Sequence, residues 1–160
     1  MAAMKKRTFL SILLAIFSLA VSWDLCAADA AMGTWKLNVS KSKYTPGPPP
    51  KSGMLKYEAS EGGVKRTGET IEADGKKTGF EYTAKYDGTD YPVTGSEYFD
   101  TIAIKRIDDN TAEATLKKAG TVVRNAKRVI SKNGKVMTIT MSGTNDKGEE
   151  IKNVSVYDKQ

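Results

Sequence analysis

The feature that most constrains this chain is a series of short stretches in which apolar and polar residues alternate. The first spans residues 33–40 and places Trp35 and Leu37 on one face and Lys36 on the other. This period of two residues is that of a half-buried β-strand. Similar stretches follow as far as residue 157, separated by dipeptides typical of tight hairpin turns: Asp74-Gly75, Asp87-Gly88 and Asn133-Gly134.

These stretches predict an all-β fold of eight or nine strands, with no convincing helix after residue 28. Short connections between alternating strands indicate antiparallel neighbours, and an open meander of this length leaves two exposed edges. We therefore predict an antiparallel meander closed into an up-and-down β-barrel, with a two-sheet β-sandwich as the alternative. Pro92 marks residues 89–95 as a loop or edge segment, and Gly68 predicts a bulge or bend in the strand over residues 64–73.

The first 28 residues have the features of a secretory signal peptide. A basic triplet at residues 5–7 precedes an apolar run at residues 9–21, and a short polar stretch then leads to the small residues 26–28. The run is about 13 residues long, whereas a membrane-spanning helix needs roughly 20. Lipid attachment at Cys26 is disfavoured because a leucine precedes it. We expect cleavage after Ala28, a periplasmic or secreted location, and no stable membrane anchor after cleavage.

The composition excludes several kinds of chemistry. The chain has no histidine and a single cysteine, Cys26, which the predicted cleavage removes. The remaining chain then has no disulfide, no Ser-His-Asp or Cys-His nucleophile, and no zinc, copper or haem site built on His or Cys. The paired acidic residues fall in predicted turns, where they suit turn geometry and solubility: Asp87/Asp90, Asp108/Asp109 and Glu149/Glu150. We therefore predict no catalytic residue, no cofactor and no metal site.

The distribution of charge argues against a nucleic-acid partner. The whole chain has 25 basic and 19 acidic residues and a net charge of +6, but its like charges form no long block. A nucleic-acid site would gather the basic residues into one patch. The spread of charge indicates an ordinary solvated surface, and the sequence specifies no oligomeric state.

Several stretches of the chain resemble the calycin group. Gly33-Thr34-Trp35-Lys36-Leu37 resembles the opening of lipocalins and intracellular fatty-acid-binding proteins, and residues 133–140 and 154–159 resemble the last hairpin of a fatty-acid-binding protein. Residues 86–95 are similar to a group of uncharacterised secreted bacterial proteins of lipocalin-like type. The resemblance implies a single lipocalin-like β-barrel domain over residues 29–160 that holds a small hydrophobic or amphipathic ligand.

The chain departs from fatty-acid-binding proteins at two places. Those proteins carry a helix-turn-helix lid after the first strand, whereas the prolines within residues 46–50 favour a stiff, extended crossing over the end of the barrel. They also hold the ligand carboxylate with an Arg and a Tyr two residues apart on the last strand. The matching positions here are Ser155 and Tyr157, so the resemblance carries over only Tyr157.

The candidate ligand-binding residues are aromatic residues of the predicted strands and two arginines: Trp35, Tyr57, Phe80, Tyr82, Arg124, Arg128 and Tyr157. Aromatic side chains line the cavity in some barrels and fill the core in others, so both interpretations stay open. Arg124 and Arg128 lie in the same phase as Val122 and Ile130, and alternation does not tell which face is inside. Inside the barrel they would pair with an anionic ligand, whereas outside they would belong to a solvated edge strand.

The sequence favours an exported, non-catalytic, lipocalin-like protein that binds a small hydrophobic or amphipathic molecule. The alternative is a structural or protein-interaction module of the cell envelope, which would use an exposed sheet face or the proline-rich segment. An enzyme that relies only on carboxylate, Tyr, Lys or Arg side chains ranks last, because the acidic pairs fall in predicted turns.

Overall fold

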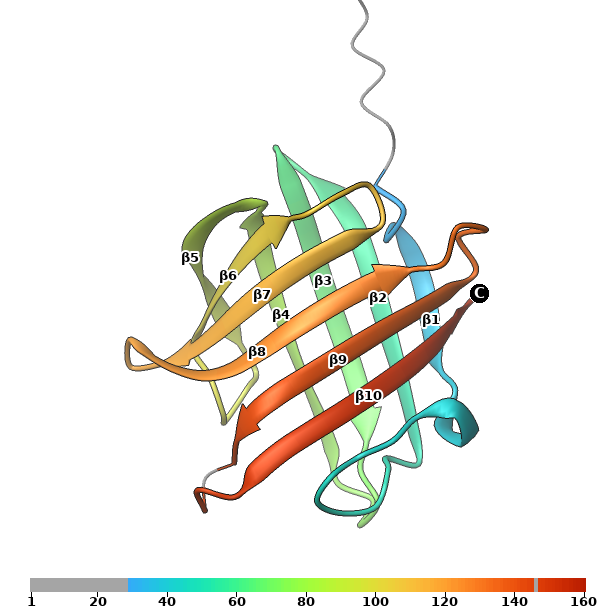
Figure 1. Cartoon of the computed structure of the whole chain (residues 1–160), viewed down its shortest axis with the longest axis vertical. Helices are drawn as coiled ribbons and strands as arrows, with labels where there is room; N and C mark the ends of the chain where they lie inside the picture. The colour runs from blue at the N-terminus through green and yellow to red at the C-terminus, as the bar shows by residue number, and fades with distance from the viewer. Residues whose placement is uncertain (1–28, 146) are drawn as a thin grey trace, which may run out of the picture.

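The computed structural model describes residues 29–145 and 147–160 and folds them into one closed, ten-stranded antiparallel β-barrel (Figure 1). Consecutive strands pair with each other, and β1 closes the barrel by pairing with β10. The predicted up-and-down barrel is confirmed, with ten strands rather than eight or nine, and the two-sheet sandwich is wrong. The strands are β1 (Gly33–Leu37), β2 (Ser52–Ser60), β3 (Gly63–Ile71), β4 (Lys77–Lys85), β5 (Asp87–Thr94), β6 (Thr101–Arg106), β7 (Thr111–Lys118), β8 (Thr121–Ile130), β9 (Val136–Thr144) and β10 (Glu150–Lys159).

The additional strand is β5, which covers most of the segment predicted to be a loop or edge. Its Pro92 is in register with β6, and the amide of the next residue donates to a carbonyl on the β6 side. The proline nitrogen therefore faces β4, with which β5 is in register only at Glu81↔Thr94 and Tyr82↔Val93. No ladder hydrogen bond is lost at this point, so the strand tolerates the proline.

The number of paired residues differs from one pair of neighbouring strands to the next around the barrel. The β9–β10 and β2–β3 pairings each extend over nine residue pairs. By contrast, β1 and β10 share three residue pairs and β4 and β5 share two. These two short pairings divide the wall into a four-stranded part, β1–β4, and a six-stranded part, β5–β10.

Gly68 lies within an unbroken register of β3 with both β2 and β4, so it is not the site of a β-bulge, and the alternative of a bend stays a prediction. The register shifts instead within the β5–β6 and β7–β8 pairings. A glycine suits position 68 because the guanidinium of Arg66 occupies the space that a side chain would take.

One end of the barrel is covered by the residues that precede β1. Trp35 is fully buried, and its indole Nε1 donates to the carbonyl of Ala31 at 2.7 Å. Ala31 is itself fully buried, so this hydrogen bond holds residues 29–32 against the core. Trp35 and Leu37, which the alternation placed on one face of the first strand, both lie on its buried face.

The opposite end of the barrel is crossed by the proline-rich segment (Figure 1). After β1, the short 3-10 helix η1 (Val39–Lys41) leads to Lys43, whose backbone bridges to Val154 in β10. The chain then crosses to β3, where the amide of Lys51 donates to the carbonyl of Ile71 at 2.8 Å. The predicted crossing is confirmed, and η1 is the only helix among the described residues, which therefore hold no helix-turn-helix lid.

The predicted signal peptide, residues 1–28, lies outside the described residues, as does Cys26. Its cleavage and the export of the chain therefore stay predictions. Within residues 29–145 and 147–160, no helix has the length and apolar character that crossing a bilayer requires.

Candidate functional site

The barrel contains a cavity of about 630 Å³ that reaches the end crossed by the proline-rich segment. Tyr44, Pro46 and Pro50 line it at that end. Its apolar wall comes from β6, β7, β9 and β10: Ile102, Ile104, Leu116, Ile139, Met141 and Ile151. A cavity of this size, with an apolar wall and a few polar groups, is typical of small-molecule binding sites.

Six of the seven candidate residues line this cavity: Tyr57, Phe80, Tyr82, Arg124, Arg128 and Tyr157. The seventh, Trp35, is buried in the core and is not part of the lining. The interpretation of residues 121–131 as a solvated edge strand is wrong, because β8 is paired on both sides and its two arginines line the interior. Contact of these residues with a ligand stays a prediction.

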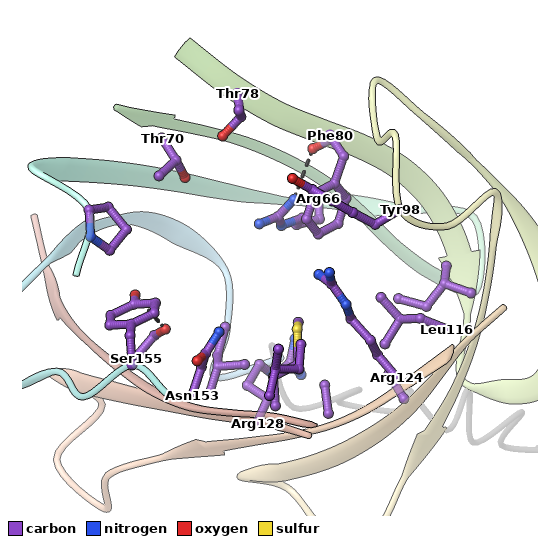
Figure 2. Close-up of a pocket in the computed structure, with 18 of the residues that line it drawn as sticks. Arg66, Thr70, Thr78, Phe80, Tyr98, Leu116, Arg124, Arg128, Asn153 and Ser155 are labelled. Atoms are coloured by element: carbon purple, nitrogen blue, oxygen red, sulfur yellow. Dashed lines mark hydrogen bonds between the residues drawn. The ribbon is translucent and has the colours of Figure 1, made fainter. Parts of the chain in front are cut away.

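A third arginine, Arg66 of β3, lines the same cavity and was not among the candidates. It is 7% exposed, its Nη1 donates to the carbonyl of Phe80 at 2.8 Å, and its Cζ lies 3.7 Å from the centroid of the Phe80 ring (Figure 2). No carboxylate in the described part of the chain forms an ion pair with it. A sequence signal existed, since Arg66 shares a face with Val64, but the mixture of charged and β-branched residues in this strand concealed which face is buried.

Arg124 reaches into the cavity from the opposite wall, on β8. Its Cζ lies 4.6 Å from the centroid of the Tyr98 ring and 5.9 Å from that of Phe99. Figure 2 shows its guanidinium pointing across the open space toward Arg66. Cation–π contacts of this kind help to hold a guanidinium in place. Two cationic groups, from β3 and β8, thus face the same part of the cavity.

Arg66 and Arg124 also border a second, smaller cavity of about 460 Å³. Residues of the β3–β4 connection and of the segment between β5 and β6 line it, including Lys76 and Glu97, whose Nζ and Oε2 lie 3.3 Å apart. Both arginines and Phe80 belong to the lining of both cavities. The arginine pair therefore lies where the two cavities meet.

Arg128 is held differently, in a charged cluster with Asp29, Tyr86 and Arg106. Its Nη2 donates to the hydroxyl of Tyr86 at 3.1 Å and lies 3.6 Å from a carboxylate oxygen of Asp29. Asp29 also accepts from Nη2 of Arg106 at 3.1 Å and from the hydroxyl of Tyr86. Burial raises the pKa of Tyr86 to about 12, so this hydroxyl keeps its proton at neutral pH. Because Asp29 offsets its charge, Arg128 is a weaker partner for an anionic ligand than Arg66. Sequence reasoning gave Asp29 no role.

Buried tyrosines add neutral hydroxyl groups to the cavity. Burial raises the pKa of Tyr82 and of Tyr157 above the usual value, and it does the same for Tyr44. The hydroxyl of Tyr44 lies 2.7 Å from Oγ of Ser155, which joins the proline-rich crossing to β10. These hydroxyls are uncharged hydrogen-bonding groups at neutral pH. The cavity thus combines an apolar wall, neutral hydroxyls and a cationic pair.

Three acidic side chains line the larger cavity: Glu72, Asp74 and Glu113. Glu72 accepts from the hydroxyl of Thr78 at 2.6 Å, and both residues line the two cavities. Among residues 29–145 and 147–160, no three His, Cys, Asp or Glu side chains lie close enough together to hold a metal ion.

No protein-family model matches the chain, and no curated protein matches it. Among solved structures, it is similar to the zebrafish ileal bile acid-binding protein complexed with cholic acid. The two share 12% sequence identity over 82% of this chain and 99% of that chain, with a TM-score of 0.48. The strand order of the structure establishes the fold as a closed antiparallel barrel. This is the fold that the resemblance to the calycin group implied.

Proposed function

We propose that this protein binds a small amphipathic anion inside its barrel. The anionic group would lie between Arg66 and Arg124, and the apolar part would lie along the aliphatic and aromatic wall. The observation that carries the proposal is the pair of guanidinium groups facing each other across a cavity with an apolar wall (Figure 2). A carboxylate or sulfonate can accept charge-assisted hydrogen bonds from two guanidinium groups at once.

The proposal describes an exported protein that binds its ligand without transforming it. Support for export comes from the basic and apolar segments within residues 1–28, and support for binding without turnover comes from the lack of histidine and of any cysteine after residue 26. Mass spectrometry of the exported protein is expected to place the N-terminus at Asp29. Ligand extracted after prolonged incubation with the protein is expected to be chemically unchanged, and a new product would overturn the binding-only role.

A matched pair of ligands tests the binding proposal. Dodecanoate and dodecanol have the same alkyl chain and differ in the charge of the head group, and both can compete with an environment-sensitive fluorescent fatty-acid probe. We expect saturable displacement by both ligands, with dodecanoate bound on the order of tenfold more tightly, because hydrogen bonds to charged groups contribute about 1.5–3 kcal/mol. Lack of saturable binding by the wild-type chain would overturn the proposal.

Substitutions identify the groups responsible. Arg66→Met and Arg124→Met should each lower the affinity for dodecanoate by roughly tenfold and leave the affinity for dodecanol within about threefold. Lys105→Met is the matched control, because Lys105 is exposed on β6 and does not line either cavity. Equal affinity of the wild-type chain for the acid and the alcohol would show that the arginine pair does not hold the head group.

A further inference from the structure

The guanidinium of Arg66 occupies the space that a side chain at position 68 would take. A Cβ built on Gly68 would lie 2.6 Å from Nη2, 2.7 Å from Cζ and 2.8 Å from Nη1 of Arg66. Because these three distances are nearly equal, the guanidinium plane lies flat against the strand at this glycine. Any side chain at position 68 would occupy the same space.

Phe80 provides the second contact that fixes the guanidinium. Gly68 and Phe80 are paired in register across β3 and β4, and the Phe80 ring centroid lies 3.7 Å from Cζ of Arg66. The carbonyl of the same phenylalanine accepts a hydrogen bond from Nη1 at 2.8 Å. The Phe80 ring in turn packs edge-on against Phe99, with centroids 4.9 Å apart and an interplanar angle of 86°.

Gly68 and the Phe80 ring form a slot that holds the guanidinium of Arg66. We propose that Gly68 is a specificity-determining position, which sets the preference of the cavity for anionic over neutral amphiphiles by holding Arg66 in this slot. Gly68 acts through Arg66 and is a positioning residue. The inference rests on the proposed function, because it concerns the same arginine pair. Arg66 lines the cavity from this slot, and Figure 2 shows it opposite Arg124. An anion held there meets a cation whose position is fixed before binding, which lowers the entropic cost of binding.

Gly68→Ala separates this role from a role in folding. The backbone at Gly68 has no positive φ, so alanine adopts it without strain, and the atoms that the new methyl meets belong to the flexible end of the Arg66 side chain. The barrel is therefore expected to remain folded while the guanidinium moves out of the slot. Gly53→Ala is the matched control, because Gly53 lies on the neighbouring strand and its added methyl meets mainly the side chain of Leu37, at 3.3 Å.

The readout is the ratio of the affinities for dodecanoate and dodecanol, which a merely structural role would not change selectively. We expect Gly68→Ala to lower this ratio by roughly tenfold, and Gly53→Ala to leave it at the wild-type value. Thermal unfolding of each variant checks that it is folded at the assay temperature. If Gly68→Ala is unfolded there, Phe80→Leu, which removes the covering ring and keeps the accepting carbonyl, is expected to lower the same ratio.

A double-mutant cycle shows whether Gly68 acts through Arg66. Arg66→Met should reduce the dodecanoate affinity strongly in the wild-type background and by less than about twofold in the Gly68→Ala background, since coupled residues are non-additive. Additive losses, or a wild-type ratio in Gly68→Ala, would overturn the inference while the wild-type chain still binds dodecanoate. Failure of the wild-type chain to bind either ligand would instead overturn the proposed function.

Discussion

Replacing Asp29 by asparagine tests the charged cluster that joins the start of the described chain to the barrel. The side chain of Asp29 is 9% exposed and forms ion pairs with Arg128, which is 12% exposed, and with Arg106, which is 37% exposed. Asparagine keeps the shape and one accepting oxygen but removes the negative charge. Arg128 then keeps a buried charge without its counter-ion, whereas Arg106 can turn toward water.

The magnitude follows from this difference between the two arginines. Removing one partner of a buried ion pair costs about 3–5 kcal/mol, and the partial exposure of Arg106 places the expected loss near the lower limit, at about 3 kcal/mol. For a domain of this size, with an unfolding entropy of about 2.1 cal/mol/K per residue, this loss corresponds to a fall in Tm of about 10 °C.

Equilibrium unfolding in urea measures the effect, with Glu97→Gln as the matched control. Glu97 also pairs with a basic side chain, Lys76, at 3.3 Å, but its own side chain is 73% exposed. An exposed pair contributes about 0–1 kcal/mol, so the control should stay close to the wild-type free energy of unfolding. If Asp29→Asn changes that free energy by no more than Glu97→Gln does, the buried cluster does not stabilise the barrel.

Three further predictions concern the core, the effect of pH and the cavity. Trp35→Ala should lower the free energy of unfolding by about 3–5 kcal/mol in urea titrations, and a loss below about 1 kcal/mol would contradict its full burial. Because burial raises the pKa of Tyr86 to about 12, the folded state favours the protonated phenol. This contribution is fully present below the unfolded pKa of about 10 and is lost as the pH rises toward 12, so urea midpoints should fall over that range and fall less steeply in Tyr86→Phe. Ala126→Phe places a ring in the cavity and leaves less room for a ligand, so it should abolish displacement of the fluorescent probe by dodecanoate. An unchanged affinity for dodecanoate would show that the ligand binds elsewhere.

Local alternation predicted most of the fold, because each strand of a closed barrel buries one face. Trp35 and Leu37 share the buried phase, and both are in the core. The segment around Pro92 was misjudged because its tolerance of proline depends on the absence of pairing with β4 at that point, which is a property of the neighbouring strand. The same holds for Gly68, because the side chain of Arg66 lies over this glycine and its strand pairs there without a bulge.

The sequence predicted the aromatic residues of the cavity wall better than it predicted the charged residues. Tyr57, Phe80 and Tyr82 alternate with polar neighbours, so their shared interior position followed from the period of two residues. Arg66 could not be placed, because its strand is mixed in character on both faces. The role of Asp29 depends on a partner 77 residues away, Arg106, and no local pattern reports a contact at that separation.

The uneven pairing of the wall has a mechanical consequence. Parting β4 from β5 breaks less backbone pairing than parting any other neighbours among the described strands, and the smaller cavity lies beside this joint, where it is lined by Gly79 of β4 and by Gly95 just after β5. A ligand that enters through this flank need not displace the proline-rich crossing. Regions with few hydrogen bonds open most readily. We therefore expect amide exchange to be faster along the facing edges of β4 and β5 than between β9 and β10, and to slow when dodecanoate fills the barrel.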